Sequence, residues 1–316
     1  MMKKRKEGAV VTVGTFDGVH LGHQAILKRL CAIASEKKLE RVVYAFTFPP
    51  RQGTFRQTLK EQPKPCLLLP ESAKLKLLKH YVDRVEQADF VEVKNLKAER
   101  FVREILLEQL IARVVVVGDS FRFGRAREGD VSLLRRVGKD QEIFVVEVPS
   151  VVVDQAPVSS TWIRELVASG EVGKARALLG RPPLFVGEVV EGDGLGRRLG
   201  YPTANLAFDP VVLHPARGVY LVHAFWLRKR EPGLLYFGVR PTLKGSAMRC
   251  EVHLLSPPDD DLYGKTMEVH LLHKLRGDRS FPSLEALHRQ MGLDAARARS
   301  LLPAMKVQTP FLLENS

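Results

Sequence analysis

The stretch Gly14-Thr15-Phe16-Asp17-Gly18-Val19-His20-Leu21-Gly22-His23 joins two segments of different character. Before it, the apolar and largely β-branched run 9–13 predicts a buried strand. After it, apolar residues recur at helical spacing, so that one helical face carries Ile26, Leu27, Leu30, Ile33 and Ala34. The order of strand, glycine-rich turn and helix is the feature that decides the fold of this part of the chain.

The turn itself predicts a phosphate site. Its two histidines, His20 and His23, stand three residues apart where the helix begins, with Gly22 between them. A helix N-terminus offers free N–H groups and partial positive charge, glycine lets a phosphate approach the backbone, and imidazole donates hydrogen bonds to developing charge. The alternative is a tight turn with two solvated histidines. The combination of glycines, spacing and strand–turn–helix context favours a nucleotide phosphate site.

Composition places the chain among globular proteins. Its 316 residues suffice for two domains with their own cores, and 45% hydrophobic and 27% charged residues are typical of soluble proteins. No apolar run approaches the roughly 20 residues that cross a bilayer, and the basic start at 1–7 lacks the apolar segment of a signal peptide. Cys31, Cys66 and Cys250 show neither disulfide nor metal spacing. A cytoplasmic protein without a membrane partner is expected.

The net charge of +13 allows two kinds of partner. Such a surplus attracts nucleic acid, but it also suits polyanionic small molecules. Apart from the first six residues the basic residues are dispersed, and no basic helical face interleaved with aromatic residues is found. Phosphate sites on a solvated surface are therefore favoured, and no nucleic-acid partner is expected.

Residues 9–150 alternate apolar strands with helical patterns. Continuous β-branched runs between helices indicate a parallel sheet buried on both faces, whose ligands bind at the carboxyl ends of the strands. Gly14 and Gly118 both end predicted strands, so the loops after them are expected to face one site. The predicted strands are 9–13, 41–48, 113–118 and 143–148, and the predicted helices are 22–38, 71–81, 98–110 and 130–137.

The pattern changes after the cluster Gly180-Arg181-Pro182-Pro183, which predicts a domain boundary. Two short helices are expected before it, in 159–180. Beyond it, short apolar segments separated by Gly, Pro and Asp indicate an antiparallel barrel or sandwich, and Ser283 is expected to cap a last helix. These segments lie at 184–190, 218–227, 234–238, 249–255 and 266–273. The predicted domains are 1–182 and 183–316.

Two more loops of the first half carry groups suited to a nucleotide. The loop at 117–124 follows a predicted strand, and its aromatic residues fit stacking on a ring or packing beneath the loop equally well. The run 159–164 opens a helix. Its hydroxyls are explained as caps when taken alone, whereas Arg164, one turn into the helix, can bind phosphate bidentately.

Together these motifs are recognisable. GTFDGVHLGH at 14–23 and SSTWIR at 159–164 resemble the HxGH nucleotidylyltransferase superfamily, and GDSFRFG at 118–124 is similar to a third signature. Within that superfamily the match is to the FMN adenylyltransferase module of bacterial bifunctional FAD synthetases, a Rossmann-like α/β domain. The resemblance implies attack of the FMN phosphate on the α-phosphate of ATP, which releases pyrophosphate and forms FAD. Such chemistry depends on positioning and charge neutralisation.

The resemblance also implies residue roles. His20 and His23 would bind the ATP phosphates and stabilise the transition state. Opposite them, the β- and γ-phosphates would be held by Ser160, Thr161 and Arg164. The other residues of the ATP pocket would be Gly14, Phe16, Asp17 and Gly22, and further candidates for flavin contact are Asp119, Phe121 and, from the second half, Arg276. The family usually follows its second strand with F-x-P-H-P, whereas Arg51 stands here at the histidine position.

The second half opens with a glycine loop. Gly192, Gly194 and Gly196 alternate after a predicted strand, which is equally typical of a phosphate loop and of a plain turn. The run Gly-Tyr-Pro-Thr-Ala-Asn at 200–205 adds Thr203 and Asn205, whose hard oxygens suit Mg²⁺ bound together with phosphate.

This run resembles the riboflavin kinase signature G-x-G-x-G-R-x-L-G-[FY]-P-T-A-N, and ordered matches continue to about residue 290. The resemblance implies a six-stranded antiparallel barrel with a terminal helix. It assigns Glu251 as the base that takes the proton of the riboflavin 5′-hydroxyl as this oxygen attacks the γ-phosphate of ATP. It assigns Thr203 and Asn205 to Mg²⁺ and ATP, and the three glycines to the phosphate flap. Tyr236 stands where the family has asparagine.

The sequence thus predicts a bifunctional enzyme that uses ATP and Mg²⁺ to convert riboflavin to FMN and FMN to FAD. Arg51 and Tyr236 motivate one alternative, an enzyme with only one active half. The other alternative is a basic nucleotide- or nucleic-acid-binding regulator without catalysis. A homo-oligomer is left open.

Overall fold

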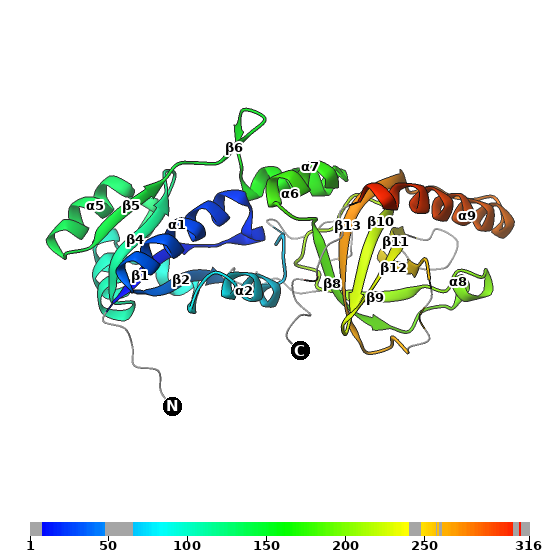
Figure 1. Ribbon diagram of the computed structural model, residues 1–316, viewed down its shortest axis with the longest axis horizontal. Helices are drawn as coiled ribbons and strands as arrows, with labels where there is room; N and C mark the ends of the chain where they lie inside the picture. The colour runs from blue at the N-terminus through cyan, green and yellow to red at the C-terminus, as the bar shows by residue number, and fades with distance from the viewer. Residues whose placement is uncertain are drawn as a thin grey trace. The chain divides into compact units, whose positions relative to one another are not determined.

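The computed structural model describes residues 8–47, 66–239, 248–256, 258, 261–305 and 310, which form two compact units (Figure 1). Of these residues, the first unit holds 8–47 and 71–160, and the second holds 66–70 and those from Thr161 onward. Within this part of the chain, no helix has the length and hydropathy of a membrane span.

The first unit contains a five-stranded sheet of order β3-β2-β1-β4-β5, in which all neighbouring strands are parallel. The strands are β1 (Ala9–Gly14), β2 (Glu40–Thr47), β3 (Arg84–Asp89), β4 (Ala112–Gly118) and β5 (Phe144–Val148). Two strands on one side of β1 and two on the other give the Rossmann-like order that the sequence predicted.

Helices connect these strands and cover the sheet. They are α1 (Leu21–Lys37), α2 (Glu71–Lys79), α3 (Phe90–Val93), α4 (Ala98–Arg100), a π-helical segment (Phe101–Gln109) and α5 (Val131–Asp140). Val11 and Val115 of the central strands pack in one core with Leu106 and Leu134 of the helices, and all four side chains are fully buried. The predicted helices and the four predicted strands are confirmed to within a few residues.

Strand β3 was missed because its sequence, Arg-Val-Glu-Gln-Ala-Asp, is polar. It lies at the edge of the sheet, and only Ala88 of its residues is buried. Arg84 pairs with Glu40 of β2 at 3.2 Å and with Glu86. One cross-strand ion pair and one within β3 therefore stand where apolar contacts would make a strand recognisable in a sequence.

The second unit is built around a closed antiparallel barrel of order β10-β11-β12-β9-β8-β13. This decides between the barrel and the sandwich that the strand pattern left open. The strands are β8 (Leu184–Val190), β9 (Ala204–Phe208), β10 (Gly218–Trp226), β11 (Lys229–Val239), β12 (Met248–Leu254) and β13 (Thr266–Gly277). Ahead of them come α6 (Ser160–Ser169) and α7 (Val172–Leu179), the two short helices that the sequence predicted.

Strand β10 is buried along its whole length because both of its faces are covered. Tyr220 and Val222 point into the barrel core, whereas Val219 and Leu221 pack with Ala298 of the last helix, α9 (Leu284–Leu301). The Ser283 hydroxyl accepts a hydrogen bond from the Ala286 N–H at 3.2 Å, which confirms the predicted cap of α9.

A buried histidine makes the stability of the barrel unit pH-dependent. The His223 side chain is 6% exposed, and burial, with smaller contributions from Arg230 and His270, lowers its pKa from 6.5 to about 4. Below pH 6.5 the unfolded chain therefore binds a proton that the folded chain does not, so stability falls as the pH is lowered toward 4. At pH 5 the loss is expected to be about 1–2 kcal/mol relative to pH 7.5.

Urea unfolding followed at both pH values tests this expectation. The variant His223→Gln lacks the titrating group, so its difference in unfolding free energy between pH 7.5 and pH 5 should be smaller than that of the wild type. An equal difference in the two proteins would show that His223 does not contribute to the acid sensitivity.

Candidate active sites

The first candidate site lies at the carboxyl ends of β1 and β4. These strands are parallel neighbours, with Val10 opposite Val114 and Val11 opposite Val115, so Gly14 and Gly118 end at the same edge of the sheet. This confirms that the loops after the two glycines face one region. The turn at 14–23 lies between β1 and α1, as the sequence predicted.

The two histidines of this turn stack on each other. The ring centroids of His20 and His23 are 3.7 Å apart with the planes at 19°, and His20 Nδ1 accepts a hydrogen bond from the His23 N–H at 3.4 Å as the N-cap of α1. Phe16 covers His23 from another side, with centroids 5.1 Å apart. The imidazole pair is thus fixed at a helix N-terminus, where anions are favoured.

His23 is held neutral and has hydrogen-bonding capacity to spare. Burial, then the charge of His20, then that of Lys74 lower its pKa well below 6.5. Within the described residues, its buried Nδ1 has no hydrogen-bond partner. An unsatisfied buried polar atom is costly, and at a functional site it marks a place for a ligand. The ring is therefore ready to bind an incoming phosphate.

The backbone of the turn is strained where it approaches the histidines. Phe16 has φ 50°, Gly18 φ 76° and Val19 φ 41°. A β-branched residue such as Val19 rarely adopts a positive φ, and such strain is kept where the structure around it enforces it. One tie is the Ser160 hydroxyl, which donates to the Asp17 carbonyl at 3.0 Å and so brings the second predicted motif against the first.

Lys74 is a residue of this site that the sequence analysis missed. Its side chain is 3% exposed, and its ammonium donates to the carbonyl of Phe46 at the end of β2 and pairs with Glu71 at 2.6 Å. Its charge acts on His23. Lysines at this spacing along α2 look like solvated residues, so only the observed burial distinguishes Lys74 from its neighbours.

The loop after β4 is held in place by its own contacts. Asp119 accepts hydrogen bonds from the Ser150 N–H at 2.9 Å and from the Ser150 hydroxyl at 2.6 Å, and the hydroxyl contact is the main cause of a lowered Asp119 pKa. Phe121 stacks on Phe123 with centroids 5.4 Å apart and packs against the core of the unit. Both residues therefore have structural roles, whatever ligand contacts they add.

Two of the remaining predicted residues of the first half lie on α6, the helix that begins at Ser160. Thr161 and Arg164 belong to the second compact unit, where Thr161 is exposed and Arg164 Nε donates to the Cys66 carbonyl at 2.8 Å. Arg51, at the departure from the family pattern, lies outside the described residues.

The second candidate site is a cavity of about 430 Å³ at the barrel. It brings together Gly196, Thr203, Tyr236, Glu251 and Arg276, which the sequence analysis had singled out from separate parts of the chain. The wall opposite the strands includes Leu287 and Met291 of α9. Such a mostly apolar hollow with a few convergent polar groups is typical of a site for a small molecule.

Glu251 is one of the buried carboxylates of this cavity, with a side chain 4% exposed, and Asp294 of α9 is another. Arg249, two residues earlier on β12, approaches it at 3.8 Å and also pairs with Asp193 of the glycine loop at 2.6 Å. One guanidinium thus joins the loop to the carboxylate. Arg249 and Asp193 are functional candidates that the sequence did not reveal, because an arginine on a strand and an aspartate in a loop are commonplace.

The glycine loop lies close to the two predicted metal ligands. A side chain at Gly192 would clash with the Asn205 amide, and one at Gly196 would clash with the Tyr201 carbonyl and come within 3.0 Å of Thr203 Oγ1, so glycine lets the loop lie there. Asn205 is in turn paired with Glu251 across β9 and β12. Gly194 has φ 67° and open space around it.

Tyr236 and Arg276 have protein partners within the cavity. The Tyr236 hydroxyl lies 3.3 Å from the Asp278 carboxylate and from the Val239 carbonyl. Arg276 Nε donates to Asp294 of α9 at 2.9 Å, and its guanidinium lies 5.6 Å from the centre of the Phe281 ring. Tyrosine in place of the family's asparagine therefore ties β11 to the segment after β13.

These two sites place the chain among the ATP-dependent transferases in which a nucleotidylyltransferase fold and a small-molecule kinase barrel share one polypeptide. A family model described as FAD synthetase matches residues 2–162, and one described as riboflavin kinase matches residues 179–302. The chain belongs to the family of bifunctional riboflavin kinase/FMN adenylyltransferases.

Two relatives carry that description over nearly their whole length. The protein of Escherichia coli (strain K12) is 35% identical over 304 residues, and the protein of Pseudomonas fluorescens is 38% identical over 302 residues; each alignment covers 95% of both chains. A crystal structure described as a macrolide-efflux protein from Streptococcus pneumoniae superposes with a TM-score of 0.79 at 28% identity, covering 93% of this chain and 95% of that one. The similarity of fold thus extends over both units of the chain.

Proposed function

We propose that this chain phosphorylates riboflavin to FMN at the barrel and adenylylates FMN to FAD at the histidine turn. The observation that carries the proposal is that the residues of each motif come together in the structure. His20, stacked on His23, caps α1 in one unit, and buried Glu251 shares a cavity with Thr203 in the other. We assign the two activities to residues 1–182 and 183–316; the order of the family-model matches, at 2–162 and 179–302, supports this assignment.

In the adenylyl transfer, an FMN phosphate oxygen forms a bond to the α-phosphorus of ATP while the bond from that phosphorus to the bridging oxygen of pyrophosphate breaks. The protein supplies positioning and charge neutralisation rather than a covalent nucleophile. His20 and His23 donate to the phosphate oxygens, and Lys74 adds a fixed positive charge near them. Gly14, Phe16, Asp17 and Gly22 shape the pocket. Ser160, Thr161 and Arg164 hold the β- and γ-phosphates.

In the kinase reaction, Glu251 accepts the proton of the riboflavin 5′-hydroxyl. The freed oxygen bonds to the γ-phosphorus of ATP, and the bond to the β–γ bridging oxygen breaks, which releases ADP. The glycines at 192, 194 and 196 let the loop close over the phosphates. Arg276 and the apolar wall of the cavity hold the flavin, and Asp119 and Phe121 contact it in the adenylyltransferase site.

Mg²⁺ fits the barrel site as a partner of bound ATP. Within the described ranges, no three His, Cys, Asp or Glu side chains gather to form a metal cage. Mg²⁺ commonly takes only one or two protein oxygens together with substrate phosphates. Thr203 and Asn205 offer such oxygens beside the glycine loop, and the ion would supply charge neutralisation for the transferred phosphate.

Incubation with ATP and Mg²⁺ plus either riboflavin or FMN, followed by separation of the flavins, tests the proposal. We expect FMN and FAD from riboflavin, and FAD with pyrophosphate from FMN. Absence of FMN in the first assay would refute the kinase assignment. Absence of FAD in the second would refute the adenylyltransferase assignment and leave the enzyme with one activity, as the departures at Arg51 and Tyr236 suggested.

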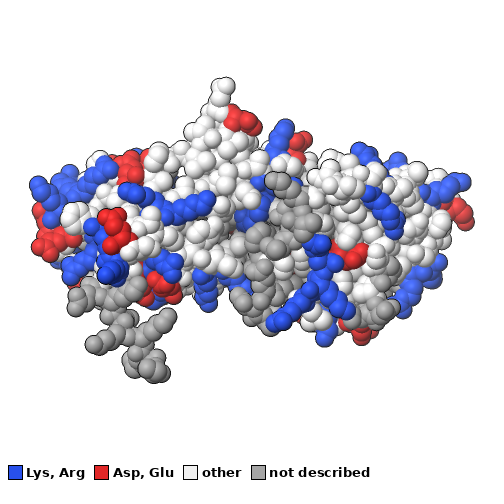
Figure 2. Space-filling model, viewed as in Figure 1, with Lys and Arg blue, Asp and Glu red and all other residues white. Residues whose placement is uncertain are grey.

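A regulator that only binds nucleic acid is disfavoured by the distribution of charge. Figure 2 shows lysine and arginine side chains spread over the visible face, interrupted by acidic and neutral residues, without one continuous basic stripe. We therefore propose small-molecule partners and no nucleic-acid partner. The free cysteines Cys31, Cys66 and Cys250 suit a reducing compartment, and we propose a cytoplasmic location. The regulator would bind RNA in a salt-sensitive way and be indifferent to changes at Glu251.

Arg249 provides a prediction for the kinase reaction. Because it joins the loop at Asp193 to Glu251, the change Arg249→Gln should lower kcat for riboflavin phosphorylation by about 10- to 100-fold, in the range typical of lost positioning. Asp193→Asn removes only the loop contact, so it should mainly raise KM for ATP. Steady-state kinetics of both variants with varied ATP test this. If both variants showed the same decrease in kcat and the same increase in KM for ATP, Arg249 would have no effect on Glu251 beyond its contact with Asp193.

A further inference from the structure

A basic hollow lies at the end of the first unit's sheet that is opposite the histidine turn. It has a volume of about 630 Å³ and is lined by residues at the amino ends of β4 and β5, in the last turn of α1, and on α5 and the link from α5 to β5. Since α1 begins beside His20 and ends at Lys37, its 17 residues separate the two places by about 25 Å. The hollow is therefore not part of either site described above.

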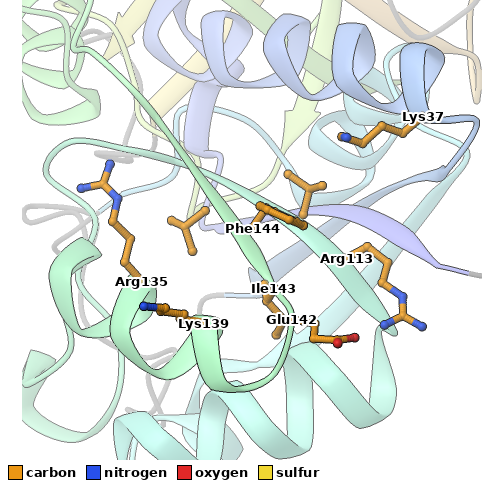
Figure 3. A pocket seen from close by; sticks show the side chains of 9 residues that line it. Lys37, Arg113, Arg135, Lys139, Glu142, Ile143 and Phe144 are labelled. Carbon is orange, nitrogen blue, oxygen red and sulfur yellow. The ribbon is translucent and has the colours of Figure 1, made fainter.

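Positive charge dominates the rim of this hollow. Four of its residues are Lys or Arg and one is Glu: Lys37, Arg113, Arg135, Lys139 and Glu142. Only Arg135 has an anionic partner among the described residues, since it pairs with Glu147 at 2.6 Å. Figure 3 shows Arg135 and Lys139 on one side of the hollow, and Lys37 and Arg113 on the other.

The floor of the hollow is apolar and includes a largely exposed aromatic ring. Phe144, the first residue of β5, is 70% exposed, the largest value among the exposed apolar side chains that the structure describes. Figure 3 places its ring between the two groups of cations. Beside it lie Val114, Ile143 and Val145. A flat apolar floor between cations suits a ligand that combines a planar ring with negative charge.

Ordinary structural reasons explain only part of this arrangement. Lys37 and Lys139 stand in the last turns of their helices, where positive charge is favoured by the helix dipole. The helix dipole does not explain the position of Arg113, which lies on a strand, or the exposure of Phe144. The first part of the exposed Arg113 side chain lies against Gly8, where a Cβ atom would meet its Cγ at 2.5 Å.

We propose that this hollow binds a phosphorylated compound with a planar aromatic ring, of the nucleotide class. The ring stacks on Phe144, and the phosphates are bound by Arg113, Lys37 and Lys139. The volume fits one such molecule, since small-molecule pockets span about 300–1,000 Å³. The site is a second nucleotide site of the unit, separate from the one that contains the histidines.

Lysine acetylation of the full chain, measured by mass spectrometry, tests the site. It reports on each lysine separately, so nucleotides bound at the two proposed active sites do not obscure the result. ADP or FMN should lower the acetylation of Lys37 and Lys139 at least about threefold at millimolar concentration, while Lys28, exposed on the same helix, stays unchanged. Whichever nucleotide protects at the lower concentration identifies the ring. Riboflavin, which lacks phosphate, and pyrophosphate, which lacks a ring, should protect poorly.

Two surface variants complete the test. Phe144→Ser and Arg113→Gln should each raise the nucleotide concentration needed for half-protection by about tenfold, whereas Leu227→Ser, another exposed apolar position, should not. Absence of protection by both nucleotides, equal protection by pyrophosphate, or unchanged protection in the Phe144 variant would overturn the proposal.

Discussion

Replacing His23 by alanine is expected to lower the rate of FMN adenylylation by about 10²- to 10³-fold. The ring that is lost has a buried Nδ1 without a partner in the described structure, and its pKa is lowered by burial, His20 and Lys74. A neutral ring adds no positive charge to the empty site, yet it can donate to phosphate as charge develops there. Alanine removes this donor and leaves His20 without its stacking partner.

The measurement is initial-rate formation of FAD and pyrophosphate from FMN and ATP. Riboflavin phosphorylation by the same variant should stay within about twofold of wild type, because the kinase cavity belongs to the other compact unit and changes at sites without shared partners usually act independently. His80→Ala is the matched control, since His80 is an exposed histidine of the same unit. Full adenylylation in the His23 variant, or equal loss in the His80 variant, would contradict the proposed role.

Much of the fold follows from local patterns in the sequence. The run 9–13 and the run before Gly118 are buried strands because β-branched residues fill both faces of a central parallel strand. Ser283 caps α9 because a hydroxyl satisfies a free N–H wherever a helix begins. The site residues were found differently: the glycine loop is equally typical of a plain turn when taken alone, and the resemblance to the riboflavin kinase signature assigned the role of Glu251.

What the sequence hid depends on contacts between distant segments. Lys74 is recognised only because folding buries its ammonium beside the end of β2. Arg249 is a functional candidate because it forms an ion pair with Asp193, 56 positions earlier, and lies 3.8 Å from Glu251. The strand β3 escaped because ion pairs stabilise it. Each of these features is a pairing that no single window of sequence displays.

The change Glu251→Gln is expected to reduce riboflavin phosphorylation by about 10²- to 10⁴-fold, the range for loss of a general base. Glutamine has nearly the same shape, so the packing of this buried position and the strand pairing with Asn205 and Tyr236 should be kept. What disappears is the ability to take the proton of the 5′-hydroxyl. The loss should therefore fall on kcat, with KM for riboflavin changed little.

Formation of FMN and ADP from riboflavin measures this effect, and FAD formation from added FMN in the same preparation shows that the rest of the chain is folded. Glu188→Gln is the control, because Glu188 is an exposed glutamate on β8 of the same barrel. If the Glu251 variant kept most of its kcat, proton transfer to this carboxylate would not limit the reaction. Glu251 would then have a purely structural role through its ion pair with Arg249. In that case the Arg249→Gln variant should also keep most of its kcat.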